Sequence, residues 1–122
     1  MDFLNPEKFK VEVKENTNKM IKIKSKDEIT KMTRAAEIVR DVLFELENII
    51  NPGISTIELD SFAEKFILDQ DATPGFKGLY GFPATLCVSI NDEVVHGIPS
   101  KRTLKDGDVV GIVTATAAVE EF

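Results

Sequence analysis

Apolar residues recur at helical spacing only after an opening segment that has no period. Residues 1–20 are polar and aperiodic, and we expect a polar N-terminal extension there. Residues 21–24 alternate strictly between isoleucine and lysine, which predicts a brief strand. Ser25 and Glu28 then stand at capping-box spacing, in which each residue satisfies a free amide of the first turn, so a helix starts there. The Asn-Pro-Gly sequence at residues 51–53 ends this helix.

The first predicted helix carries one apolar stripe, whose members recur at steps of three and four residues. The stripe consists of Ile29, Met32, Ala36, Val39, Leu43, Leu46 and Ile50. A second capping box, at Ser55 and Glu58, starts a shorter amphipathic helix. Its apolar face contains Ile57, Phe62, Ala63, Phe66 and Ile67. Because the connection is short, we expect the two helices to form a hairpin.

The pattern changes after the second helix. Glycines and prolines between residues 74 and 83 predict a loop. Two β-rich runs, at residues 85–90 and 93–98, flank a turn-forming Asn-Asp pair and predict a β-hairpin. The apolar run from Val109 follows another turn and predicts a buried strand. Two amphipathic helices packed on an antiparallel sheet constitute an α+β fold.

Composition and charge narrow the class of protein. A chain of 122 residues suffices for about one small domain with a core of its own. The net charge of −6 disfavours a nucleic-acid groove, because phosphate binding requires a positive surface. Basic residues concentrate only in the first part of the chain, where we expect a solvated tail; weak contact with an anionic partner such as ribosomal RNA is the alternative. These residues are Lys8, Lys10, Lys14, Lys19, Lys22, Lys24 and Lys26.

Cysteine usage and the lack of long apolar runs bear on location. Cys87 is the single cysteine, so it cannot form an internal disulfide, and it matches no zinc spacing. We therefore expect a reducing compartment, the cytoplasm. No apolar run approaches the length of a membrane span, so no membrane partner is expected. The first residues also lack the charged-then-apolar order of a secretory signal.

His96 is the only histidine and the first candidate for chemistry. Gly97 and Pro99 constrain the backbone directly after it, which places the imidazole at the end of a predicted strand. A rigid strand end beside a loop suits a catalytic or binding side chain, and a surface histidine without such a role is the alternative. Ser89 and Cys87 have no base positioned by the sequence to activate them, so the sequence does not support a nucleophilic mechanism.

Several motifs in one order carry a resemblance to a known family. NPGIST at residues 51–56, FKGLYGFPATLCVSIN at 76–91, EVVHGIP at 93–99 and LKDGDVVGI at 104–112 follow the first helix. In this order and spacing, residues 21–112 resemble the N-terminal half of a type I methionine aminopeptidase. The resemblance implies half of a pita-bread fold, in which two similar α+β halves enclose a dinuclear metal site. It also implies removal of the initiator methionine from nascent proteins, with an N-terminal methionyl peptide as the substrate.

The resemblance also implies roles for individual residues. The histidine of the HGIP motif, His96, would hydrogen-bond the substrate at the scissile peptide and stabilise the developing tetrahedral centre. The pocket for the methionine side chain would include Phe76, Leu79, Phe82 and Cys87, whose apolar and polarizable surfaces suit a thioether. Leu79 departs from the family, where this position often carries an aromatic residue. Ordinary core packing is the alternative for these pocket residues.

The metal ligands of the family have no matching residues in this sequence. Relatives bind two divalent ions (Co, Mn, Fe or Zn) through two aspartates, a histidine and two glutamates. The first aspartate normally follows the VVGI strand, where this chain has Val113, and the second would lie eleven residues further on. We therefore assign no metal ligand and expect no metal cofactor in this chain. Local turns account for Asp92, Asp106 and Asp108, so we do not expect a rebuilt site.

Three hypotheses for function remain open. The first is a truncated methionine aminopeptidase that keeps part of the substrate pocket and is inactive on its own. The second is a pseudoenzyme or assembly partner, in which an exposed sheet edge and apolar face pair with another chain, for example a second copy. The third is a frame-shifted gene fragment without a selected function, since residues 113–122 form a divergent tail after the family-like 21–112. The protein sequence does not choose between the second and the third.

Overall fold

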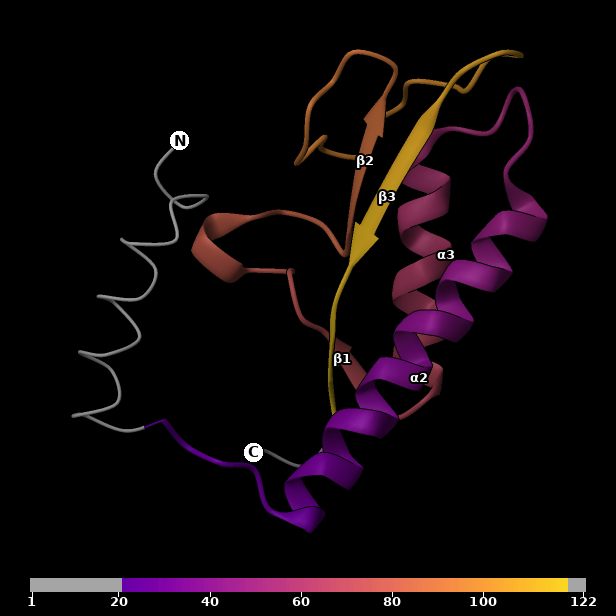
Figure 1. The fold of residues 1–122 in the computed structure, drawn as a ribbon. Coiled ribbons are helices and arrows are strands. Elements are labelled where there is room, and N and C mark those ends of the chain that lie inside the picture. Colours follow the sequence, from indigo (N-terminus) through magenta and orange to yellow (C-terminus); the bar gives the residue numbers. More distant parts are fainter. Residues whose placement is uncertain (1–20, 119–122) are drawn as a thin grey trace.

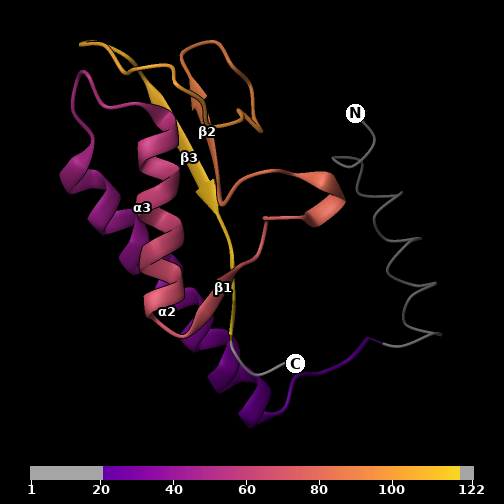
Figure 2. The same cartoon turned by 180° about the vertical axis from the view of Figure 1, so that it is seen from behind.

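The structure is a computed structural model that describes residues 21–118, and it has two helices on one side of short antiparallel strands (Figures 1 and 2). The predicted α+β class is confirmed. The helices are α2 (Lys26–Ile49) and α3 (Thr56–Asp69). The strands are β1 (Ala72–Pro74), β2 (Leu86–Ile90), β3 (Val110–Thr114) and β4 (Thr116–Ala118), and a 3-10 turn, η2 (Leu79–Gly81), precedes β2. Strand β1 pairs with β4 and β2 pairs with β3, both antiparallel.

Both helices begin where their caps predict. Ser25 Oγ accepts from the amide of Glu28 at 3.1 Å, and Glu28 Oε1 accepts from the amide of Ser25 at 3.0 Å. Ser55 and Glu58 make the same reciprocal pair at the start of α3, at 3.2 and 2.7 Å. These hydrogen bonds lower the pKa of both glutamates, because they favour the charged carboxylate. The capping boxes therefore anchor the two helix starts through local chemistry alone.

The buried face of α2 differs from the predicted stripe. Ile38, Val42 and Leu46 are buried, whereas Ile29 and Leu43 lie on exposed positions. Only Leu46 belongs to both sets. Two adjacent faces of this helix carry apolar residues at three- and four-residue steps, and contact with α3 and β4 selects the face that becomes buried. On α3, Ala63 and Ile67 are buried as predicted.

Residues 21–24 do not form the predicted strand. They lie before α2 as exposed backbone without secondary structure, and no strand among the described residues pairs with them. Ile21 and Ile23 are 58% and 89% exposed. The alternation of isoleucine and lysine was therefore not sufficient to form a strand, because a strand also needs a hydrogen-bonding partner for its backbone.

Strand β2 pairs with a different segment from the one predicted. Its partner is β3, in the register Val88 to Ile112, while residues 93–98 run as irregular backbone. On the edge of β2 away from β3, the amide of Leu86 donates to Asp60 Oδ1, that of Val88 to the carbonyl of Gly97, and that of Ile90 to Glu93 Oε1. Two side chains and one carbonyl thus satisfy this edge, so no hairpin ladder forms.

The two faces of the β2–β3 pair have different surroundings. Leu86, Val88 and Ile90 belong to the buried core shared with the helices, and Val110 and Ile112 pack against that core from β3. Cys87 and Ser89 alternate with them and therefore face the opposite side. The helices thus support one face of the sheet, and the other face is available to build a site.

Residues 113–118, which we predicted to belong to a divergent tail, contribute to both strand pairs. Val113 and Thr114 complete β3, and β4 pairs with β1 in the register Pro74 to Thr116. Thr116 Oγ1 also donates to the carbonyl of Ala35 on α2 at 2.7 Å. The predictions for residues 1–20 and 119–122 lie outside the described residues. Neither helix within 21–118 is both long and apolar enough to cross a membrane.

Candidate functional site

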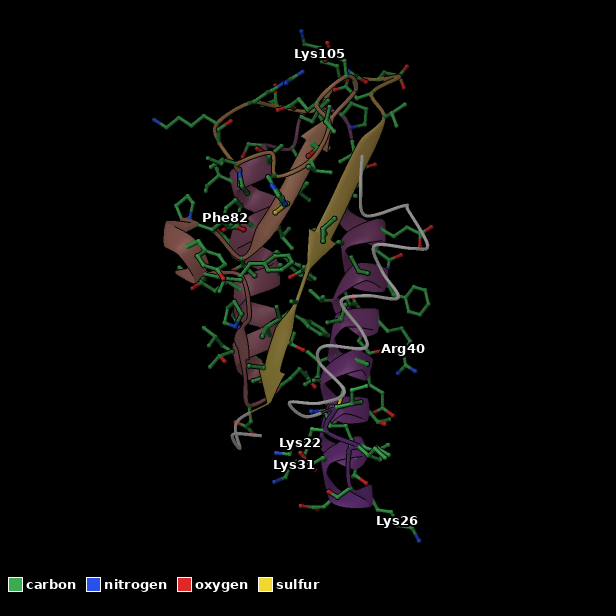
Figure 3. All side chains as sticks on the ribbon, turned by 60° about the vertical axis from the view of Figure 1, so that its left-hand side comes forward. Lys22, Lys26, Lys31, Arg40, Phe82 and Lys105 are labelled. Carbon is green, nitrogen blue, oxygen red and sulfur yellow. The ribbon has the colours of Figure 1, made fainter. Side chains whose placement is uncertain are left out.

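The glycine-rich segment before β2 forms a loop that projects from the strands, as predicted (Figure 3, where Phe82 is labelled). The amide of Gly75 donates to the carbonyl of Ala115 at 2.8 Å, which holds the base of the loop. The amide of Gly78 donates to the carbonyl of Phe82 at 2.8 Å and closes the tip. Gly78 has φ of 86°, a left-handed conformation that suits glycine. The loop therefore has a defined shape beside the free face of β2.

A cavity of about 460 Å³ lies under this loop. All four residues predicted for the methionine pocket line it, together with His96. The lining comprises Phe76, Leu79, Tyr80, Gly81, Phe82, Pro83, Cys87, His96 and Ile98. Sequence reasoning missed Tyr80 and Ile98, although both lie within the GLYGFP and HGIP motifs. The structure thus brings a loop, a strand and a second loop around one apolar hollow.

A second hollow of about 260 Å³ adjoins the first and shares Phe76, Cys87 and His96 with it. Its remaining lining residues are Ser89, Val94, Val95, Gly111 and Val113. His96 and Cys87 therefore border both hollows. An imidazole in this position can contact a ligand in either one.

His96 does not lie at a strand end, contrary to the prediction. It sits in an irregular segment and adopts φ of 60°, in the left-handed region that non-glycine residues rarely occupy. The following residue, Gly97, docks against β2, because the amide of Val88 donates to its carbonyl at 2.9 Å. A Cβ atom on Gly97 would lie 2.0 Å from the carbonyl oxygen of Val88, so only glycine permits this approach. A docked loop, not a strand, positions the imidazole.

Cys87 provides a sulfur-bearing wall for both hollows. Its side chain is buried on β2, and burial raises the pKa of the thiol above its ordinary value. The thiol therefore stays protonated at neutral pH, and a protonated thiol is a poor nucleophile. Cys87 thus acts as a soft apolar surface here.

Asp60 connects the second helix to the start of β2, a role that the sequence reasoning did not find. Its Oδ1 accepts from the amides of Thr85 and Leu86 at 2.9 and 2.7 Å. Burial raises the pKa of this carboxyl, and the two backbone hydrogen bonds partly oppose that increase. The available signal was a lone acid between Leu59 and Ala63 on the buried side of α3. Asp60 fixes the strand that carries Cys87.

The described residues do not fit a pair of divalent metal ions. Across 21–118, no three His, Cys, Asp or Glu side chains gather closely enough to hold a metal. Val113, at the position predicted for the first aspartate, borders the second hollow with an apolar side chain. Asp108 instead accepts from the amide of Lys105 and from Asn91, and Glu93 accepts from the amide of Ile90. These carboxylates serve local turns, as predicted for Asp108.

Comparison with known proteins places the chain. Residues 30–119 match the pattern of metallopeptidase family M24. The chain belongs to this family. It is 52% identical over 93 residues to a methionine aminopeptidase of Clostridium perfringens, which covers 76% of this chain and 37% of that protein. It is also 52% identical over 93 residues to methionine aminopeptidase 1 of Bacillus subtilis, covering 76% of this chain and 38% of the relative.

Solved structures of M24 proteins share the fold. The methionine aminopeptidase of Thermotoga maritima superimposes with a TM-score of 0.79 at 35% identity, over 81% of this chain and 40% of that one. The methionine aminopeptidase of Rickettsia prowazekii gives a TM-score of 0.77 at 34% identity, over 80% of this chain and 39% of that one. The observed fold is therefore part of a pita-bread M24 fold, as the resemblance implied. The chain spans under half the length of these relatives.

Proposed function

We propose that this M24 chain carries the part of a methionine aminopeptidase that recognises the N-terminal methionine of a peptide. The observation that supports this proposal is the hollow of about 460 Å³ under the 76–83 loop, bordered by His96. Its volume lies in the range of small-ligand pockets, and apolar walls with few polar groups are typical of such pockets. We expect the substrate in the cytoplasm, where newly made proteins present their initiator methionine.

The chemistry of the walls suits a methionine side chain. Phe76 and Phe82 supply aromatic surface, and Cys87 supplies a buried sulfur. A flexible, unbranched thioether can fill an irregular apolar hollow, and its sulfur contacts aromatic edges favourably. His96 also borders this hollow and is exposed, so its imidazole would meet the peptide amide that follows the methionine. Apolar walls and one exposed imidazole thus suit the side chain and the backbone of a methionyl residue.

His96 would act on the peptide bond that follows the methionine. An imidazole N–H donates a hydrogen bond, and a donor already in place near a carbonyl oxygen stabilises negative charge that develops there. The docked Gly97 limits movement of this loop before the substrate arrives. The described residues gather no metal-ligating group, and we propose that this chain does not hydrolyse peptides on its own.

Binding and turnover of Met-Ala-Ser test the two parts of this proposal. Calorimetry with the chain should detect binding of Met-Ala-Ser and of its norleucine analogue, which keeps the unbranched shape. Val-Ala-Ser, which is β-branched and shorter, is the control and should bind more weakly. Equal affinity for all three peptides would contradict recognition of the methionine side chain. Release of free methionine with added Co²⁺ or Mn²⁺, abolished by His96→Ala, would contradict inactivity.

A second candidate function is assembly with another copy of the chain, and the outer edge of β3 favours it. In the described part of the chain, β3 pairs only with β2. The antiparallel register turns the amides of Val110, Ile112 and Thr114 away from β2. An edge centred on Ile112 is self-complementary, because an antiparallel copy can pair with it about a two-fold axis. Sedimentation at micromolar concentration should then show a dimer, and a monomer at every concentration rules this candidate out.

A further inference from the structure

Ser89 lies beside His96 on the sheet face opposite the core. Its side chain is half-buried and borders the second hollow together with His96. Ser89 Oγ accepts a hydrogen bond from the amide of Gly97 at 3.1 Å. This contact joins β2 to the loop that carries the imidazole, across eight positions of sequence.

The amide that Ser89 binds belongs to the peptide unit between His96 and Gly97. That unit is planar, so holding its N–H also holds the carbonyl group of His96 and with it the ψ angle of His96. The other end of Gly97 is held separately, because its carbonyl accepts from the amide of Val88. One residue is thus clamped at both its backbone groups, once by backbone and once by the Ser89 hydroxyl.

The clamp matters because His96 occupies an unfavourable backbone conformation. Its φ of 60° lies in the left-handed region, and such residues persist only where the surroundings determine them. Residues 91–96 are exposed and provide little packing of their own. Gly97, in contrast, is buried, so its amide cannot exchange Ser89 for bulk water without movement of the loop. The hydroxyl therefore supplies the hydrogen bond that the loop needs to keep its conformation.

We propose that Ser89 is the positioning residue of His96, setting the orientation of the imidazole toward the hollow. Its importance for peptide recognition rests on the function proposed above. Ser89 acts as a hydrogen-bond acceptor here and not as a nucleophile.

The single histidine makes this proposal directly measurable. In a carbon-proton NMR spectrum of the chain, the imidazole gives one Cε1–H signal, which belongs to His96. Ser89→Ala should move this signal toward the position found in the unfolded chain and accelerate hydrogen exchange of the Gly97 amide about fivefold or more, since a lost hydrogen bond is worth ~1 kcal/mol. Ser89→Thr keeps the hydroxyl and suits a strand, so the His96 signal and the Gly97 exchange rate should stay close to those of the unmodified chain. Ser61→Ala, on α3, is the control and should change neither.

Ligand binding adds a second readout. Ser89→Ala should weaken binding of Met-Ala-Ser about fivefold, and Ser89→Thr should restore it. If Ser89→Ala does not fold, Ser89→Cys replaces it, because a thiol has similar volume but accepts hydrogen bonds weakly. An unchanged His96 signal and Gly97 exchange rate in the folded variant would overturn the proposal. So would a lower unfolding midpoint with an unmoved His96 signal, because the role would then be structural only.

The two proposals fail in different ways. If the unmodified chain does not bind Met-Ala-Ser, the proposed function is wrong, while the His96 signal and the Gly97 exchange rate still decide the role of Ser89. If the unmodified chain binds and Ser89→Ala binds equally well with an unchanged His96 signal, the function stands and the positioning role is wrong.

Discussion

The carboxylate of Asp60 on helix α3 accepts a 2.7 Å hydrogen bond from the amide of Leu86, the first residue of β2. The neighbouring amide of Thr85 donates to the same oxygen at 2.9 Å. One buried carboxylate thus satisfies two buried amides. These hydrogen bonds also fix the start of β2 against α3, and therefore the position of Cys87 in the pocket wall.

Replacing Asp60 should lower stability strongly. Asp60→Ala leaves two buried amides without an acceptor, and the expected loss is about 2–4 kcal/mol of unfolding free energy. Urea unfolding measures this loss. Asp60→Asn keeps an acceptor oxygen and should lose less, so an equal loss in both variants would contradict the role of the two hydrogen bonds.

The charge of Asp60 should make stability depend on pH. Burial raises its pKa above the ordinary 3.8, so the folded chain holds the proton more tightly than the unfolded chain. The contribution of Asp60 is therefore most favourable below 3.8 and decreases as the pH rises through the elevated folded pKa. Unfolding free energies from pH 4 to 7 should show the original chain losing stability relative to Asp60→Asn. A difference that is constant over this range would show that the pKa is not raised.

The close approach at Gly97 predicts a steric effect of a methyl group. Gly97→Ala places Cβ 2.0 Å from the carbonyl oxygen of Val88, so the loop must move and the His96 signal should shift toward its unfolded position. We expect a cost of about 1–3 kcal/mol, typical of overpacking. Gly111→Ala is the matched control, because its Cβ would meet only Ser89 O at 3.6 Å, an ordinary contact. Thermal unfolding and the His96 NMR signal separate the two variants, and equal behaviour would contradict the docked geometry.

The buried face of α2 predicts unequal costs for one chemical change at two positions. Ile38 is 2% exposed and Ile29 is 52% exposed. Ile38→Ala should cost about 2–5 kcal/mol because it leaves a cavity, whereas Ile29→Ala should cost within about 0.5 kcal/mol. Urea unfolding of both variants compares them directly. Similar losses of unfolding free energy in both variants would contradict the observed buried face of α2 and favour the predicted stripe.

Phe82 should affect ligand binding more than stability. It is half-buried on the projecting loop and lies outside the core cluster. Phe82→Ala should weaken binding of Met-Ala-Ser about tenfold, in line with ~1.4 kcal/mol for removing an aromatic wall. Phe44→Ala is the control, since Phe44 is 59% exposed on α2 and lines neither of the two hollows. Calorimetry with both variants, alongside unfolding, distinguishes a pocket residue from a core residue.

Features that depend on near neighbours in sequence could be predicted. The capping boxes at Ser25 and Ser55 act over three residues, and both form as expected. The motif residues Phe76 and Phe82 were expected in one pocket through the family resemblance, and they line one cavity. The capping hydrogen bonds join residues three positions apart, and Phe76 and Phe82 lie in one short loop, so both features depend mainly on nearby residues.

Features that depend on contacts between residues distant in sequence could not be predicted. The partner of β2 is β3, whose paired residues lie 20 to 28 positions further along the chain, and not the adjacent 93–98 segment. Neither the left-handed φ of His96 nor its clamp by Ser89 leaves a periodic signal in the sequence.

The sequence by itself thus determined the α+β class, both helix starts, the M24 family and the candidate pocket residues. The tertiary structure alone decided which face of α2 is buried, which strand pairs with β2, and how His96 is held. Helix starts and turns arise from interactions among a few consecutive residues, whose free energies are local. Face selection, pairing and loop docking depend on which of several apolar surfaces and unpaired amides meet in the folded chain, and several choices are compatible with the same local pattern.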